Sequence, residues 1–260
     1  MPKLAANLSM LFGEFPFMAR FEQAAKAGFK AVEYLFPYPY PAAELQQQLR
    51  DFGLEQALFN APPGDWDAGE RGLACIPGRE AEFEAGLEAA LAYAAQLGNR
   101  RIHVMAGITP AAVDPVEVRA CYIANLQWAA AKAASAGITL LIEPINNRDM
   151  PGYFLNYPDE AVALLDAIAA PNVRLQFDCY HCQRMQGDVV ATFARLQPWI
   201  EHIQIAGVPG RHEPDLGELN YGYILNAFDQ AGYQGFVGCE YLPSTTTWAG
   251  LGWMQRIVDQ

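Results

Sequence analysis

The sequence predicts an α/β fold, a (β/α)8 TIM barrel, in which eight parallel strands alternate with helices. Helix-like stretches that end in Gly or Pro alternate with short runs rich in β-branched and aromatic residues. Eight such runs in 260 residues give about 32 residues per unit, which matches a barrel of about 250 residues. No change of composition marks a linker, so we expect one domain over residues 1–260.

The first expected strand lies near the N-terminus, and each later one directly follows a Gly or a Pro. Gly favours the left-handed backbone that ends a helix, and Pro cannot continue a helix. The expected strands are residues 4–9, 29–35, 54–60, 99–105, 138–143, 172–178, 199–205 and 233–240.

The clearest helix is expected over residues 114–136. Asp114, Pro115 and Glu117 fit the cap, first and third positions of its N-terminus. An open doubly wound sheet would also alternate strands with helices. However, no Gly-rich phosphate-binding sequence follows the first strand, which favours the barrel.

The two longest irregular segments are residues 60–78 and 146–156. They follow the third and fifth expected strands, so they lie at the barrel face where active sites occur. Loops of this length in a compact domain are often functional, and we expect both to act as lids.

The charge balance excludes several classes of partner. Lys and Arg number 17 against 29 Asp and Glu, a net charge of −12, which disfavours nucleic acid and anionic lipid. No apolar run approaches the roughly 20 residues of a membrane helix, and the start lacks a signal-peptide pattern. We therefore expect a cytoplasmic protein that binds a small molecule.

The five cysteines are odd in number and irregularly spaced, which argues against a disulfide framework. Cys179 and Cys182 form a CxxC sequence, but no second pair completes a zinc site. We expect them to be ordinary reduced thiols near a strand end.

Polar residues end the later strands at intervals of about one strand–helix unit. From the fifth strand onward they are Glu143, Asp178, Gln204 and Glu240, separated by 35, 26 and 36 residues. In a barrel, consecutive strand ends surround one central pocket, so these side chains are expected to converge.

Three carboxylates around one pocket repel each other unless a cation lies between them. Oxygen ligands of this kind suit Mg²⁺ or Mn²⁺. A single acid at a strand end would more simply cap a helix or form a surface salt bridge. Three acids and an amide at this spacing predict a divalent metal site.

The four histidines occupy different predicted positions. His103 ends the fourth strand, and His181 follows Asp178 by three residues, so both are placed to point into the pocket. His202 shares a strand face with Gln204 but lies deeper, as expected of a hydrogen-bonded residue inside the barrel. His212 is expected in a loop. Four histidines are too few for a three-zinc nuclease site.

An acidic protein that binds an anion needs a local positive charge. Arg211 lies in the loop after the seventh strand, a region where barrels often bind anions. Arg71, in the long loop after the third strand, is a second candidate. Either arginine could instead be a solvated loop residue.

Longer sequence motifs, spread over essentially the whole chain, add an indication of function. They are Ala-Asn-Leu-Ser-Met-Leu-Phe (6–12), Gly-Asp-Trp (64–66), Gly-Glu-Arg-Gly (69–72), Ile-Pro-Gly-Arg-Glu (76–80), Leu-Ile-Glu-Pro-Ile-Asn (141–146), Arg-His-Glu-Pro (211–214), Gly-Glu-Leu-Asn-Tyr (217–221) and Gly-Tyr-Gln-Gly-Phe-Val-Gly-Cys-Glu-Tyr (232–241). With these motifs the chain resembles the hydroxypyruvate isomerase family, within the xylose isomerase-like TIM barrels.

The resemblance implies an aldose–ketose isomerase that interconverts hydroxypyruvate and tartronate semialdehyde (2-hydroxy-3-oxopropanoate) through an enediolate. It also implies that the four strand-end residues ligate the divalent metal and that Glu143 and Glu240 are the acid/base pair. His181, Arg211, His103 and Arg71 are the candidate substrate-binding residues.

The substrate remains open between two related groups. The 2-oxo-tetronate isomerases share His-Val-Met-Ala-Gly (103–107) and Gln-Ile-Ala-Gly (204–207), whereas Glu-Pro-Ile-Asn (143–146) resembles hydroxypyruvate isomerase. Gly207 and Leu242 stand where some hydroxypyruvate isomerases carry Asp and Lys. Two further alternatives are a ketose 3-epimerase, which usually has His in place of Gln204, and a non-catalytic barrel that binds a sugar acid or a metal. The sequence does not indicate an oligomeric state.

Overall fold

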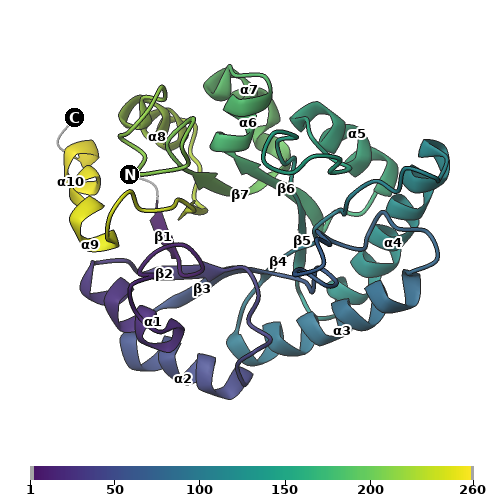
Figure 1. Ribbon diagram of the computed structural model, residues 1–260, viewed down its shortest axis with the longest axis horizontal. Helices are drawn as coiled ribbons and strands as arrows, with labels where there is room; N and C mark the ends of the chain where they lie inside the picture. Colours follow the sequence, from purple (N-terminus) through teal and green to yellow (C-terminus); the bar gives the residue numbers. More distant parts are fainter. Residues whose placement is uncertain (1–2, 259–260) are drawn as a thin grey trace.

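The computed structural model describes residues 3–258 as a closed barrel of eight parallel strands surrounded by helices (Figure 1). Each expected strand overlaps an observed one, so the predicted barrel is confirmed. Strands pair in chain order, and β1 (Lys3–Asn7) closes the sheet against β8 (Phe236–Cys239). The others are β2 (Ala31–Tyr34), β3 (Glu55–Asn60), β4 (Arg101–His103), β5 (Thr139–Ile142), β6 (Val173–Asp178) and β7 (Ile200–Ile205).

Helices cover the outside of the barrel (Figure 1). They are α1 (Phe17–Lys26), α2 (Ala42–Phe52), α3 (Glu80–Leu97), α4 (Pro115–Ser135), α5 (Pro158–Ile168), α6 (Cys179–Met185), α7 (Val189–Leu196), α8 (Tyr221–Gln230), α9 (Thr247–Gly250) and α10 (Gly252–Val258), with a 3₁₀ turn, η1, at Gln197–Trp199. As predicted, Asp114 caps α4, because its side chain accepts a hydrogen bond from the backbone N–H of Val116.

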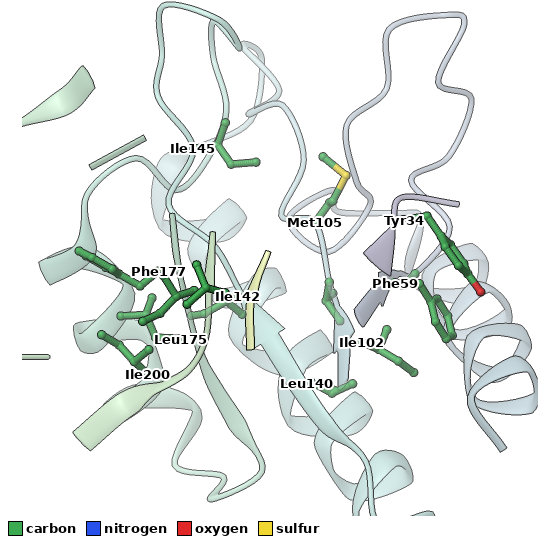
Figure 2. Packing of buried hydrophobic residues seen from close by; sticks show 14 of the residues in the cluster. Tyr34, Phe59, Ile102, Met105, Leu140, Ile142, Ile145, Leu175, Phe177 and Ile200 are labelled. Carbon is green, nitrogen blue, oxygen red and sulfur yellow. The ribbon is translucent and has the colours of Figure 1, made fainter. Parts of the chain in front are cut away.

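Alternation along the strands separates an apolar outer layer from a polar interior. Leu140 and Ile142 of β5 and Leu175 and Phe177 of β6 belong to the main hydrophobic core (Figure 2). The residues between them face the barrel interior. Both faces of these parallel strands are therefore buried. Among those on β6 are Gln176 and Asp178, both buried. The polar residues therefore concentrate inside the barrel, toward the carboxyl ends of the strands.

The loops at the carboxyl ends of β3, β4 and β5 are joined to one another. Isolated antiparallel bridges connect Gly72 with Ala106 and Ile108 with Tyr153. The Tyr153 hydroxyl also accepts a hydrogen bond of 2.8 Å from the Ala106 backbone N–H. The two long segments expected as lids thus share one connected rim with the β4–α4 loop.

The five cysteines form no disulfide bond in the structure. Cys179 and Cys182 are buried, and burial raises the pKa of the Cys182 thiol to about 12. Between residues 3 and 258, none of the helices combines the length and apolar character needed to span a bilayer.

Candidate active site

A cavity of about 270 Å³ opens at the carboxyl ends of the strands. It is lined by six residues predicted for the site, namely Arg71, His103, Glu143, His181, Arg211 and Glu240. Two predicted metal ligands, Asp178 and Gln204, do not line it but contact residues that do. Asp178 Oδ2 lies 3.8 Å from His181 Nε2, and Gln204 Oε1 lies 2.6 Å from Gln176 Nε2. The barrel therefore brings together all eight predicted residues.

The two carboxylate oxygens of Asp178 have different surroundings. Its Oδ1 accepts hydrogen bonds from the backbone N–H groups of Tyr180 and His181 and so caps α6. The simpler interpretation of a strand-end acid, a helix cap, is thus correct for this oxygen. The second oxygen, Oδ2, is buried and has no hydrogen-bond partner, so it remains available to a ligand.

Glu143 and Asp178 form the part of the site that fits a metal ion. Together with His181 they offer ligand atoms that lie within 4.8 Å of one another. Glu143 Oε1, like Asp178 Oδ2, is buried without a hydrogen-bond partner. Burial raises the pKa of both carboxyls, and the neighbouring Glu240 charge raises that of Glu143 further. A divalent cation would satisfy both oxygens and stabilise their charged forms.

Glu240 faces the same cavity from the end of β8. Its Oε2 lies 2.5 Å from Arg211 Nη2, and its Oε1 accepts a hydrogen bond of 3.2 Å from Asn7 Nδ2. Burial raises the pKa of Glu240 to about 8, although the Arg211 charge opposes this rise. Glu240 is thus a buried carboxyl that titrates near neutral pH.

Arg211 stands between two of the predicted metal ligands. Its Nη2 is also 3.9 Å from Asp178 Oδ2, and its guanidinium lies 5.1 Å from the centre of the Tyr180 ring. Tyr180 in turn donates a hydrogen bond of 2.6 Å to Asp149 Oδ2 in the loop after β5. The positive charge of Arg211 is therefore largely matched by acids of the site itself.

His181 is oriented by Asn146. Its Nδ1 lies 2.7 Å from the side-chain Nδ2 and 3.3 Å from the backbone N of Asn146. Asn146 Oδ1 already accepts two backbone hydrogen bonds, so its Nδ2 is the atom that donates to the ring. Since Nδ1 accepts, the neutral ring carries its proton on Nε2, which points toward Asp178 and Glu143. This tautomer suits a hydrogen-bond donor to substrate rather than a metal ligand.

His103 lies against Glu143 from β4, with 3.5 Å between Nε2 and Oε2. Burial lowers its pKa to about 3, so the ring is neutral at physiological pH. Its Nε2 has no hydrogen-bond partner, which leaves it available to a ligand in the cavity.

Below the cavity, Glu33 connects several residues across the barrel interior. Its carboxylate accepts hydrogen bonds from Gln204 Nε2 at 2.9 Å and Asn7 Nδ2 at 3.0 Å. Its other oxygen lies 2.6 Å from His202 Nε2, which confirms that His202 is a hydrogen-bonded residue inside the barrel. Because β2 and β7 are not neighbours in the sheet, this contact crosses the interior.

Three further polar residues at or below the cavity were not predicted from the sequence, namely Asn7, Glu33 and Gln176. Gln176 lines the cavity and donates a hydrogen bond of 2.6 Å to Gln204 Oε1. It precedes Asp178 by two residues, so the same alternation that placed His202 beside Gln204 would have found it. Asn7 and Glu33 lie near the ends of β1 and β2 and could have been found as polar residues at strand ends.

Fold and site together define a TIM-barrel enzyme with its polar site at the carboxyl ends of the strands. The model of the xylose isomerase-like TIM barrel family matches residues 21–257, and the chain belongs to this family. The resemblance found in the sequence motifs is thereby confirmed.

Several relatives that match along nearly their whole length are named as isomerases. The chain is 57% identical to 2-oxo-tetronate isomerase of Cupriavidus necator over 255 residues, which cover 98% of each chain. It is 48% identical to hydroxypyruvate isomerase of Escherichia coli over 254 residues, again 98% of each. A solved structure named AP endonuclease, family 2, from Brucella melitensis is 48% identical, with a TM-score of 0.96 and coverage of 98% and 99%. The chain is an enzyme of the isomerase class.

Proposed function

We propose that this enzyme is a metal-dependent aldose–ketose isomerase that interconverts hydroxypyruvate and tartronate semialdehyde. The observation that carries the proposal is the pair Glu143 and Glu240, two buried residues that face one cavity from the carboxyl ends of β5 and β8. Both are buried carboxyls with raised pKa values, and a raised pKa makes a carboxylate a stronger base toward a carbon proton.

The reaction moves one proton from C3 to C2 and one from the C3 hydroxyl to the C2 oxygen, so atoms and charge balance. One glutamate removes the C3 proton, and a carboxyl on the other side of the cavity serves the adjacent carbon or oxygen. Arg211 and the Nε2–H of His181 donate hydrogen bonds to the oxygens on which negative charge develops.

Glu143, Asp178, Gln204 and Glu240 would hold a divalent metal, Mg²⁺ or Mn²⁺. Their fit rests on the two unpartnered carboxylate oxygens and on the excess of buried acids. When bound, the metal supplies positive charge beside the reacting oxygens. The second lone pair of Gln204 Oε1 is available for this purpose, because Gln176 occupies only one.

A second candidate is isomerisation of a 2-oxo-tetronate. It is favoured by the 57% identity to the Cupriavidus necator enzyme and by Gly207 in the shared Gln-Ile-Ala-Gly run. A Cβ at Gly207 would lie 2.2 Å from the backbone oxygen of Leu216, so this loop excludes an Asp at position 207.

An activity panel separates the candidates. With Mg²⁺ or Mn²⁺ supplied, hydroxypyruvate, 2-oxo-tetronate and a free ketose are each followed for product, and solvent deuterium is followed at C2 and C3. We expect turnover of an oxo acid and none of the neutral ketose. Turnover of the ketose with inversion at C3 would support an epimerase. Absence of both turnover and exchange would indicate a binding protein.

The two glutamates are tested by replacing each with Gln, which keeps the shape but cannot accept a carbon proton. Because general base catalysis contributes about 10²–10⁴-fold, Glu143→Gln and Glu240→Gln should each lower kcat by at least about 10²-fold. Glu88→Gln, on the exposed face of α3, is the matched control and should retain full activity. Full activity of either site variant would refute the mechanism and direct the search for a base to His103 or His181.

A further inference from the structure

Arg71 is a guanidinium that lines the cavity without an acidic partner. It lies in the loop after β3, and its Nη1 donates to the backbone oxygens of Trp66, at 2.9 Å, and Glu70, at 2.7 Å. Among residues 3–258, Arg71 forms no ion pair, whereas Arg211 contacts both Glu240 and Asp178. The charge of Arg71 is therefore the one left free for an anionic ligand.

We propose that Arg71, stacked on Trp66, binds the carboxylate of the substrate and makes the cavity select acids over neutral sugars. This inference rests on the proposed function, because it assigns one end of the same substrate. It places the carboxylate at the loop side of the cavity and the reacting carbons beside Glu143 and Glu240.

The side chains of two acids of the same loop, Asp65 and Glu70, contact residues other than Arg71. Glu70, the neighbour of Arg71 in the chain, pairs with Arg79 and accepts a hydrogen bond from the Asp65 backbone N–H. This pairing lowers the pKa of Glu70 and holds it ionised. Asp65 uses Oδ1 to accept a hydrogen bond from the Ala68 backbone N–H. Glu70, the acid next to Arg71 in the chain, is thus neutralised by Arg79 and does not compensate Arg71.

The surroundings of Arg71 fix its position. Its guanidinium lies 3.9 Å from the centre of the Trp66 ring, and that ring packs edge-on against Phe36 at 5.1 Å. On the other side, Gly72 has a φ of +118°, and a Cβ there would lie 2.2 Å from the Met105 backbone oxygen. Stacking uses the face of a guanidinium and leaves N–H groups at its edge, where a carboxylate binds.

Electrostatics favour this placement of the carboxylate. Three buried acids occupy the strand ends, where a divalent cation and Arg211 would only balance their charges, so this end offers no surplus positive charge to a carboxylate. Met105 and Ile145 also line the cavity, at the loop end of the barrel (Figure 2). Asp149, in the loop after β5, lines the cavity too, but its carboxylate is already bonded to Tyr180 and Arg184. Arg71 is therefore the recognition group on the loop side.

The test uses Arg71→Gln and Arg71→Lys, with Arg50→Gln on the exposed face of α2 as a control for lost charge. Binding of D-glycerate, an acid that cannot isomerise, is measured by calorimetry with Mn²⁺ present, and kcat and KM are measured for hydroxypyruvate. We expect Arg71→Gln to raise both the glycerate Kd and the KM by about 10–100-fold with kcat largely kept. Arg71→Lys should give intermediate values of Kd and KM, because lysine keeps the charge but lacks the planar guanidinium that can donate two hydrogen bonds to one carboxylate.

Dihydroxyacetone, which has a hydroxymethyl group in place of the carboxylate, should be converted neither by the wild type nor by the variants, since the cavity selects acids. Wild-type glycerate binding in Arg71→Gln would overturn the proposal. A lower kcat with unchanged KM would also overturn it, because Arg71 would then act on the chemistry. If Arg71→Gln does not fold, wild-type binding by Arg71→Lys overturns it. If the wild type converts no oxo acid, the proposed function fails, and glycerate binding still decides the role of Arg71.

Discussion

At the scale of single residues, the titration of Glu240 links the site to stability. Its pKa is about 8 in the folded protein against an ordinary value of 4.5, because burial disfavours the charged form. Between these values the folded protein binds more protons than the unfolded chain. The free energy of unfolding contributed by this carboxyl therefore falls as pH rises from about 4.5 to about 8.

We therefore expect chelator-treated protein to lose stability between pH 5.5 and 8, and Glu240→Gln to lose less over the same range. Mn²⁺ should reverse the loss, because a cation binds the charged carboxylates, and at about 100 times its Kd should add about 2.7 kcal/mol. Urea unfolding at several pH values, with and without Mn²⁺, measures both effects.

Calorimetry in two buffers should show proton release on Mn²⁺ binding at pH 7. If Mn²⁺ left the free energy of unfolding unchanged at every pH, the predicted metal site would be contradicted.

At the scale of elements, β8 depends on a glycine that makes room for the Glu33 carboxylate of β2. A Cβ at Gly238 would lie 2.3 Å from Glu33 Oε2, although Gly238 itself has no positive φ. The space left by this glycine allows Glu33 to reach Gln204 and His202 on β7. The orientation of Gln204, a predicted metal ligand on β7, thus depends on a glycine of β8.

Gly238→Ala should lower the free energy of unfolding by about 1–3 kcal/mol, as overpacking does, and should weaken Mn²⁺ binding. Gly86→Ala is the matched control within α3, where a Cβ would meet Pro62 at an ordinary 3.5 Å. This control should instead stabilise the protein by about 0.5–1 kcal/mol, because Ala favours the helix. If both substitutions changed the free energy of unfolding in urea by the same amount, the Glu33 side chain would be able to move away from the added methyl group without a cost in stability.

At the scale of the whole molecule, the two ends of the chain close the barrel together. β1 pairs with β8, and the backbone N–H of Thr247 donates to Glu14 at 3.1 Å. Trp253 of α10 is fully buried, and its indole N–H donates to the Tyr241 hydroxyl at 3.0 Å. The C-terminal helices therefore stabilise the strand end that carries Glu240.

Trp253→Ala should cost about 3–5 kcal/mol of unfolding free energy, the range for removing a buried aromatic side chain. Trp248→Ala removes the same side chain at a position that is 42% exposed and should cost clearly less. Urea denaturation of both variants compares them directly. A smaller loss for Trp253→Ala than for Trp248→Ala would show that α10 contributes little to barrel closure.

The sequence by itself determined the strands, their order and the residues at their carboxyl ends. These features are local: alternation with a period of two sets which side chains share a face, and Gly or Pro marks where each helix stops. In a closed parallel barrel this is enough to bring Glu143 and Glu240 to one cavity and Asp178 close beside it. The same local pattern correctly placed His202 inside the barrel.

Only the tertiary structure decided which partners those residues have. Glu33 and His202 are 169 positions apart, and strand tilt and stagger determine that they meet across the interior. Likewise, both arginines are loop residues in the sequence, but Arg211 is paired with Glu240, whereas Arg71 forms no ion pair with any described residue and contacts backbone oxygens and Trp66. Loop conformation sets such contacts, and it depends on packing between distant segments that no local pattern encodes.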